Sequence, residues 1–468
     1  MNGVVASSDP RAAAVGASVL RNGGNAVDAA VAAVLVLFVV EPHACGPGGD
    51  AFLLYAEPGQ VPWALDGSGS VPAGLTQEAL TADGLEWVPV RGGRSVTVPG
   101  AVALLEDALL RFGTRTFGEL AGPAIDYARN GFAARRTLAQ TAVRASAHVT
   151  KDPVLGPLYC PGGDPLRAGQ RVVNPWLADT LELISNDGAA VLYRGPIADE
   201  IIRRVREDGG YLTLQDMSTH TTAQVEPVQT TFRGATVWEL PEPTQGPAVL
   251  AALDLIEPRQ TIRWEEVLEA IVAGLASAGI DLRAVPPSRV APAGPRDTTY
   301  LAVVDSAGRG ASMITSIFAD FGSHIGIQSL GGAIQNRAAT FMAMRRQPRP
   351  GKPPHTTIPG LVTRQGALEY VLGLAGGYVQ AQVQVQLLIR LLAEGLDPQP
   401  AIDAPRMRML FGGEIALEPG HPLAETYPEA VGREAGPEGF GAAQCVARRG
   451  SHLLGGADPR RDGAVALA

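Results

Sequence analysis

The chain has 468 residues, of which 46% are hydrophobic and 18% charged, so it is long enough and apolar enough to bury a substantial core. Its net charge of −9 argues against a basic surface that binds nucleic acid. The 56 glycines and 37 prolines are typical of a globular enzyme rich in loops rather than of a helical bundle.

Compartment and cofactor use are predicted from what the sequence lacks. Cys45, Cys160 and Cys445 are far apart, so neither a disulfide framework nor a zinc site is expected. The N-terminus has no basic segment before an apolar run, and the longest apolar stretch, 29–40, is shorter than the ~20 residues of a membrane-spanning helix. We expect a cytoplasmic protein without metal, cofactor, membrane or nucleic-acid partner.

The first half of the chain is predicted to be rich in helices. Residues 10–40 form the first helical region, with Asn25 near a helix start and 29–40 buried. A glycine-rich loop over 43–50 precedes a predicted strand at 51–55. Further helices are predicted within 95–135 and at 176–184, 197–206 and 265–278.

The second half changes to strand patterns. A proline-rich linker or exposed loop is predicted over 278–297. Predicted strands follow at 298–304, 310–318 and 370–374, and a helix at 379–394. Hairpins with helices outside them favour an α+β layered fold over a doubly wound sheet. Dinucleotide and P-loop motifs are absent from strand–helix junctions.

The predicted hairpin after the linker begins with a threonine. A three-residue loop over 306–308 pairs Asp305 with Arg309 and places Thr298 opposite Ser316. Two facing hydroxyls are also ordinary in β-strands. If the peptide bond before Thr298 were cut, its hydroxyl would be a nucleophile, and its own amine, with a pKa near ~7.7–8.0, would be the base.

Motifs spread over residues 3–463 resemble the gamma-glutamyltranspeptidase family of N-terminal-nucleophile hydrolases. The motifs are GGNAVDAAVAA, VEPHACGPGGDAF, SVTVPGAV, GG-x-LT-x-x-D, TTYLAVVDSAGRGASMITS, GLAGG, LDPQPAIDAPR and GGADPRRDG. The resemblance implies a four-layer αββα sandwich, made by an autocatalytically cleaved proenzyme.

In this family the cut would fall between Asp297 and Thr298. It would leave a large segment, 1–297, and a small segment, 298–468, which form one αββα domain and stay together as a heterodimer. A dimer of such heterodimers is an open alternative.

The resemblance also implies roles for single residues. Thr298 matches the family nucleophile, and Ser316 matches the second hydroxyl that supports it. Gly376 and Gly377 match the glycines whose N–H groups form the oxyanion hole. A Gly-Gly turn before a helix is suited to that task because it directs backbone donors at a developing anion.

The glutamyl-binding residues of the family are replaced in this chain. Ser68, Phe318 and Thr340 stand where the family has an arginine, an asparagine and an aspartate. His355 and Thr356 stand where it has paired serines. With GGDAF, this pattern resembles the amidohydrolase subgroup that includes oxamate amidohydrolase, and homologues in antibiotic pathways that release an oxalyl unit by carbon–carbon hydrolysis.

A small anionic acyl group would then be met by His355 and Arg337, with Arg94 as a weaker candidate. A loop-capping role for His355 and a surface ion pair for Arg337 are alternatives. His43 is expected to be structural.

Three hypotheses remain open. The preferred one is a self-processing hydrolase that acts on a small acid amide or an oxalyl-type carbonyl compound. The second is a true γ-glutamyl hydrolase or transferase with a rebuilt pocket. The third is an unprocessed, non-enzymatic homologue.

Overall fold

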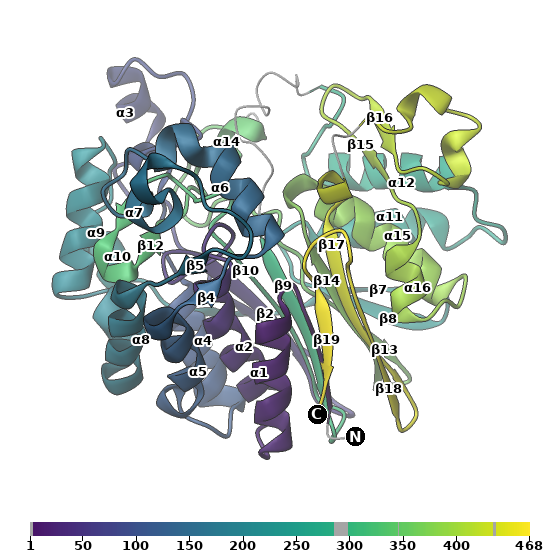
Figure 1. Ribbon diagram of the computed structural model, residues 1–468. Helices are drawn as coiled ribbons and strands as arrows, with labels where there is room; N and C mark the ends of the chain where they lie inside the picture. The colour runs from purple at the N-terminus through teal and green to yellow at the C-terminus, as the bar shows by residue number, and fades with distance from the viewer. Residues whose placement is uncertain (1–2, 285–297, 345, 434–436) are drawn as a thin grey trace.

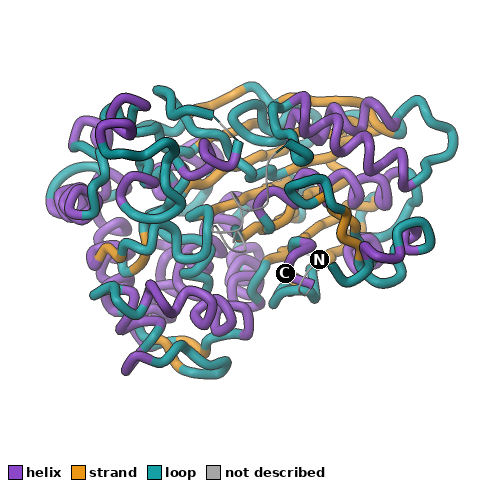
Figure 2. Tube along the Cα trace, turned by 90° about the horizontal axis from the view of Figure 1, so that it is seen from above, coloured by secondary structure: helices purple, strands orange, loops and turns teal. Residues whose placement is uncertain are grey.

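The computed structural model describes residues 3–284, 298–344, 346–433 and 437–468. Two sheets lie face to face, and helices cover the outer face of each, so the layers run α, β, β, α (Figure 1). Seen from above, the strands lie between the helical layers (Figure 2). The predicted α+β sandwich is therefore confirmed.

The first sheet has seven strands within the described residues, and it interleaves the two ends of the chain. Its order is β19 (Ala464–Leu467), β1 (Gly3–Ser7), β9 (Thr299–Asp305), β10 (Gly310–Ser316), β2 (Asp50–Ala56), β3 (Trp63–Asp66) and β6 (Ala223–Val225).

The second sheet has six strands in the same described ranges. Its order is β18 (His452–Ala457), β17 (Ala442–Arg449), β14 (Ala367–Ala375), β13 (Gly360–Arg364), β8 (Ala235–Glu239) and β7 (Val228–Phe232). Three short pairs lie outside the two sheets: β4 (Phe132–Ala133) with β5 (Arg171–Val172), β11 (Gly326–Ile327) with β12 (Gly332–Ala333), and β15 (Met407–Met409) with β16 (Ile415–Leu417).

The helices divide between the two outer layers and their loops. Those of the first half of the chain are α1 (Pro10–Arg21), α2 (Ala26–Val40), α3 (Gln77–Ala82), α4 (Ala101–Phe112), α5 (Phe117–Asn130), α6 (Arg136–Val149), α7 (Leu155–Tyr159), α8 (Pro175–Asp187), α9 (Pro196–Glu207) and α10 (Leu214–Ser218). The others are α11 (Gly246–Ile256), α12 (Trp264–Ser277), α14 (Ala339–Ala343), α15 (Gln380–Leu392) and α16 (Pro398–Asp403).

Alternation along β9 shows how the layers are held together. Leu301 and Val303 face the helical core of the first layer, whereas Tyr300, Ala302 and Val304 belong to the core between the sheets. Side chains alternate faces along a strand, so a strand covered on both sides is apolar at every position. The third core lies between the second sheet and helices α11, α12 and α15.

Helix α2 is the central helix of the first layer, and all of its residues are buried. Asn25 caps it through a reciprocal pair of hydrogen bonds with Asp28, as the sequence predicted. The predicted helical region over 10–40 is two helices, α1 and α2, and a turn separates them. Part of the predicted linker, 285–297, lies outside the described residues.

The predicted hairpin register is confirmed. Asp305 donates its N–H to the carbonyl of Arg309, and Thr315 pairs with Thr299 across β9 and β10. None of the helices in the described residues combines the length and apolar character needed to cross a membrane.

Candidate active site

Three adjacent strands of the first sheet place one row of polar side chains at the edge of the sandwich. Ser316, at the end of β10, is paired with Asp50 at the start of β2. Continuing the β9–β10 register by one residue places Thr298 on the other side of Ser316. Directly opposed residues point to the same face, so these three side chains form one row on the face toward the second sheet.

The hydroxyls of Thr298 and Ser316 are in direct contact. The Oγ atom of Ser316 lies 3.1 Å from Oγ1 of Thr298, and both side chains are buried. Ser316 Oγ also accepts the backbone N–H of Phe318 at 2.9 Å. Phe318 has a φ of 76°, so the chain turns sharply immediately after β10 and carries its phenyl ring toward the row.

The Gly376-Gly377 pair lies over this end of the first sheet. A Cβ built on Gly310 would meet Leu368 and Val371 of β14, and one built on Gly373 would meet the ring of Tyr300. Strand β14 therefore runs over β9 in the opposite direction, and its C-terminal end extends toward Thr298.

Both glycines adopt backbone conformations that favour glycine, with φ of 147° at Gly376 and 63° at Gly377. The side chain of Gln380 holds this turn. With its amide nitrogen donating to the carbonyls of Thr356 and Leu374, its oxygen accepts the N–H of Gly377 at 3.1 Å. The N–H of Gly377 is thus held in one orientation by the side chain of Gln380.

Arg337 is a fully buried cation beside Phe318. Its guanidinium carbon lies 4.7 Å from the centroid of the Phe318 ring, a cation–π distance. None of its guanidinium nitrogens makes a hydrogen bond to the described residues. Burial lowers the pKa of Arg337 to about 10, so it stays charged at neutral pH. The predicted surface ion pair for this residue is wrong, because the side chain has no solvent exposure.

Asp50 carries the charge nearest to Arg337. Its Oδ2 atom lies 3.5 Å from Nε of Arg337, whereas Oδ1 accepts the Gly69 N–H at 3.1 Å and an N–H of Gln335 at 3.2 Å. Burial raises the pKa of Asp50 to about 7, and Arg337 opposes that rise. The carboxyl group therefore changes charge near neutral pH.

His355 and Thr356 complete the same region. The ring of His355 packs edge-on against Phe52, with centroids 4.8 Å apart, and its Nε2 lies 3.9 Å from Asp50 Oδ2. Burial, with the charge of Arg337, holds the pKa of His355 well below its usual value, so the imidazole is neutral. The carbonyl of Thr356 accepts one of the two hydrogen bonds that the Gln380 amide donates.

Asp66, Lys352 and Ser68 form a group of contacts near Asp50. Asp66 on β3 accepts from the hydroxyl of Ser68 at 2.6 Å and from Nζ of Lys352 at 3.0 Å. The hydroxyl proton of Ser68 is therefore already used in the hydrogen bond to Asp66. The Thr340 hydroxyl donates to the carbonyl of Arg337 at 2.7 Å and so fixes the backbone that carries the guanidinium.

Arg94, the weaker candidate for binding the acyl group, and His43, expected to be structural, contact other residues. Arg94 donates to the carboxylate of Asp83 at 2.7 Å and is partly exposed. His43 packs with its ring 6.4 Å from that of Phe321 and accepts the Phe321 N–H through its carbonyl. Asp297, the other half of the predicted cleavage site, lies outside the described residues.

Asp50 and Gln380 belong to this cluster, although neither was predicted from the sequence as a site residue. Asp50 is part of the GGDAF motif, and an acid between a glycine-rich loop and a buried strand was the available signal. In the described ranges, no group of three or more His, Cys, Asp and Glu side chains is arranged to hold a metal ion.

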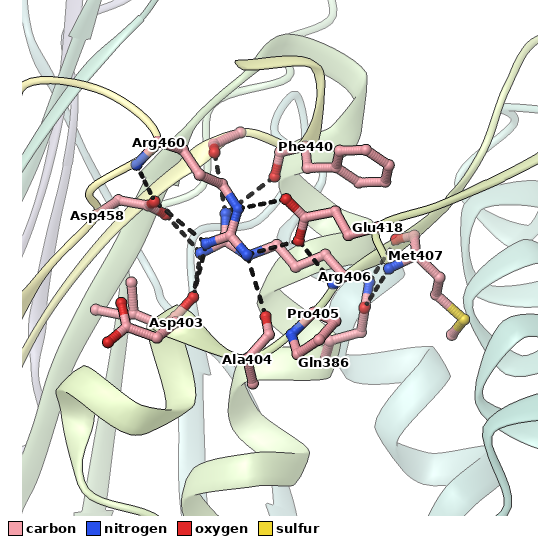
Figure 3. A network of polar contacts seen from close by, with 12 residues as sticks. Gln386, Asp403, Ala404, Pro405, Arg406, Met407, Glu418, Phe440, Asp458 and Arg460 are labelled. Atoms are coloured by element: carbon pink, nitrogen blue, oxygen red, sulfur yellow. Dashed lines mark hydrogen bonds and ion pairs between the residues drawn. The ribbon is translucent and has the colours of Figure 1, made fainter. Parts of the chain in front are cut away.

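The motifs LDPQPAIDAPR and GGADPRRDG meet in a buried ion network next to the second sheet (Figure 3). Arg406 contacts Asp458 at 2.5 Å, and Arg460 binds both carboxylate oxygens of Glu418, at 2.7 and 2.6 Å. Asp458 also accepts the N–H of Ala443 at the start of β17. These motifs therefore stabilise the sandwich rather than contact the Thr298 row.

Known proteins are similar to this chain over most of its length. The family model described as gamma-glutamyltranspeptidase matches residues 12–271 and 260–468. The glutathione hydrolase-like YwrD proenzyme of Bacillus subtilis is 29% identical over 99% of this chain and 98% of its own length. The oxamate amidohydrolase proenzyme of Klebsiella pneumoniae is 29% identical over 96% of this chain and 95% of its own.

Among solved structures, cephalosporin acylase from Bacillus halodurans superposes with a TM-score of 0.91 and 32% identity, covering 100% of this chain and 96% of that one. The relatives are named as hydrolases and acylases. The sandwich, the motifs and these matches together show that the chain is a hydrolase that belongs to the gamma-glutamyltranspeptidase family.

Proposed function

We propose that this protein is a self-processing hydrolase whose nucleophile is Thr298. Its substrate carries a short acyl group that bears a carboxylate, and this acyl group is transferred to Thr298. The observation that carries the proposal is the buried Thr298–Ser316 hydroxyl pair, 3.1 Å apart, in the same row as Asp50 and its charged neighbour Arg337.

Processing would begin at the bond before Thr298. The Oγ1 atom attacks the carbonyl carbon of residue 297, the C–N bond breaks, and the acyl group moves from nitrogen to oxygen. Water then hydrolyses this ester, which frees the hydroxyl and leaves Thr298 with an α-amine. Ser316 is close enough to Oγ1 to hydrogen-bond it during the shift.

Turnover would use the new amine as base. It takes the proton of Oγ1, the oxygen attacks the substrate carbonyl, and the N–H groups of Gly376 and Gly377 stabilise the oxyanion. The proton passes to the leaving amine, and water releases the acid from the acyl-enzyme. Gln380, which already accepts from Gly377, keeps that donor oriented between turnovers.

The two segments are built to stay together after cleavage. Strand β1 of residues 1–297 pairs with β9 and β19 of residues 298–468, and β2 pairs with β10. Cutting one loop bond removes none of these ladders, so the proposed product is a heterodimer within one domain.

The polar groups beside Thr298 favour a short anionic acyl group. Adjacent strands are ~4.8 Å apart, so the backbone of Asp50 is only about 10 Å from that of Thr298 across two strands. The guanidinium of Arg337 supplies unused donors, and neutral His355 can add one. The name of the relative oxamate amidohydrolase supports an acid of this kind. An oxalyl-type ketone, cleaved at a carbon–carbon bond, fits the same donors.

Intact-mass spectrometry and a substrate panel test the proposal. The wild type should split into 1–297 and 298–468, and Thr298→Ala should remain whole and inactive. Oxalyl-, succinyl- and glutaryl-p-nitroanilide and oxamate should be hydrolysed in preference to γ-glutamyl-p-nitroanilide. Preference for the γ-glutamyl compound would establish a rebuilt glutamyl pocket instead, and an unbroken, active chain would exclude Thr298 as an N-terminal nucleophile.

A further inference from the structure

Asp50 and Arg337 are both buried, and the atoms by which they approach each other make no hydrogen bonds to the described residues. Asp50 Oδ2 makes no hydrogen bond to the described residues, and neither do the guanidinium nitrogens of Arg337. The 3.5 Å separation of Oδ2 and Nε gives attraction without a bidentate pair. Buried charges are costly unless they are well paired, so this arrangement is suited to a third group.

The charges around Asp50 come from several elements. Arg337 and Lys352 are cationic and lower its pKa, whereas Asp66 raises it. His355 faces it from the 355–357 segment and is neutral. Tyr193, whose pKa burial raises with a contribution from Asp50, is a further titratable neighbour, and it is un-ionised at neutral pH.

We propose that Asp50 is an internal counter-ion that pairs with Arg337 when no substrate is bound, and that it takes up a proton from solvent when a carboxylate-bearing acyl group binds to Arg337. The proposal rests on the proposed function, because it concerns the same residues.

The physical reason is competition for one guanidinium. A substrate carboxylate that bonds Arg337 comes close to Oδ2 of Asp50, and two adjacent carboxylates cannot both remain ionised in a buried site. Protonation removes the repulsion and turns Asp50 from a competing acceptor into a donor to the bound carboxylate. Because the pKa of Asp50 is about 7 before a substrate binds, Asp50 is readily protonated near neutral pH.

Binding by calorimetry tests this without catalysis. Glutarate is titrated at pH 8, in buffers of different ionisation enthalpy, into wild type, Asp50→Asn and Asp179→Asn, all three in the same state of cleavage as shown by intact mass. Asp179 is an exposed carboxylate on α8, so it controls for the lost charge. Wild type and Asp179→Asn should take up close to one proton per glutarate, and Asp50→Asn none. Uptake that persists in Asp50→Asn, or glutarate that fails to bind wild type, would overturn the inference.

Kinetics separate this effect from the chemical step. For glutaryl-p-nitroanilide, the KM of wild type should rise about tenfold per pH unit above pH 7, whereas that of Asp50→Asn should stay flat and low. Pentanoyl-p-nitroanilide, which lacks the terminal carboxylate, should show no such rise in either protein. If Asp50→Asn loses γ-glutamyl turnover selectively, Asp50 binds an ammonium instead. Failure of cleavage at Thr298 would refute the proposed function but not the proton uptake measured by calorimetry.

Discussion

The hydroxyl of Ser316 lies between two partners, 3.1 Å from Oγ1 of Thr298 and 2.9 Å from the N–H of Phe318. The Phe318 N–H fixes the position of the Ser316 oxygen, and that oxygen in turn orients Thr298. One hydrogen bond of this kind, with the cost of leaving a buried group unpaired, is worth about 1–3 kcal/mol.

Ser316→Ala should therefore slow cleavage before Thr298 by about tenfold to a hundredfold without preventing folding. The measurement is the fraction of uncut chain over time by intact-mass spectrometry. Ser312→Ala is the matched control, because Ser312 is buried on the same strand and bonds Tyr300 at 2.7 Å instead. Equal slowing in both variants would mean that general loosening of β10, not the Thr298 contact, controls processing.

Gly377→Ala should lower kcat by about 10²–10³ with a much smaller change in KM, because loss of an oxyanion donor affects the transition state. The residue has a φ of 63°, so alanine strains the turn and moves the N–H that Gln380 holds. Gly366→Ala has a comparable backbone cost, with a φ of 78° in an open turn. If kcat falls equally in both variants, backbone strain alone explains the loss.

Local chemistry explains why the hairpin and helix α2 were predictable. Asp305 bonds the N–H groups of Ala307 and Arg309 and so closes the three-residue loop, which determines the register down to Thr298. At the start of α2, Asn25 and Asp28 are three residues apart and form the cap by themselves.

The parts that were not predicted depend on distant pairings. Asp50 joins the site only because β2 pairs with β10, more than 260 residues away in the chain. Strands β17 and β18, over 442–457, were not predicted. Strand β18 is at the edge of the second sheet, and β17 pairs on one side with β14, about 70 residues earlier in the chain, so tertiary packing completes the weak pattern of both. Gln380 is a polar residue inside a buried helix, and its role depends on the carbonyls of two other segments.

Asp458→Asn should destabilise the fold by about 3–5 kcal/mol, because it leaves Arg406 and Arg460 buried with too little negative charge. The network of Figure 3 would lose the charge at its centre and one of the two oxygens of Asp458, which now accept from Arg406, Arg460 and the N–H of Ala443. The measurement is urea unfolding of the uncut Thr298→Ala chain. Asp179→Asn, which removes an exposed partner of Arg129, should cost less than about 1 kcal/mol.

Glu41→Gln should change how stability depends on pH. Burial and the nearby carboxylate of Asp9 raise the pKa of Glu41 to about 7, although Ser8 donates to it at 2.8 Å. An acid whose pKa is higher in the folded state stabilises the fold fully below its unfolded pKa of 4.5, and this contribution is lost as pH rises to about 7. The loss amounts to roughly 3 kcal/mol.

Because glutamine cannot ionise, Glu41→Gln should gain stability relative to its parent between pH 5 and pH 8, measured by urea unfolding in the Thr298→Ala background. Glu207→Gln should keep a nearly constant stability difference over this range, because Arg203 lowers the pKa of Glu207 and its carboxyl is ionised above pH 5 in the folded and unfolded states alike. Ser8 also hydrogen-bonds Thr299, the residue that follows the proposed nucleophile. Ser8 therefore links the Glu41 carboxyl to Thr299. A stability difference that is constant across this pH range would show that the Glu41 carboxyl is ionised throughout.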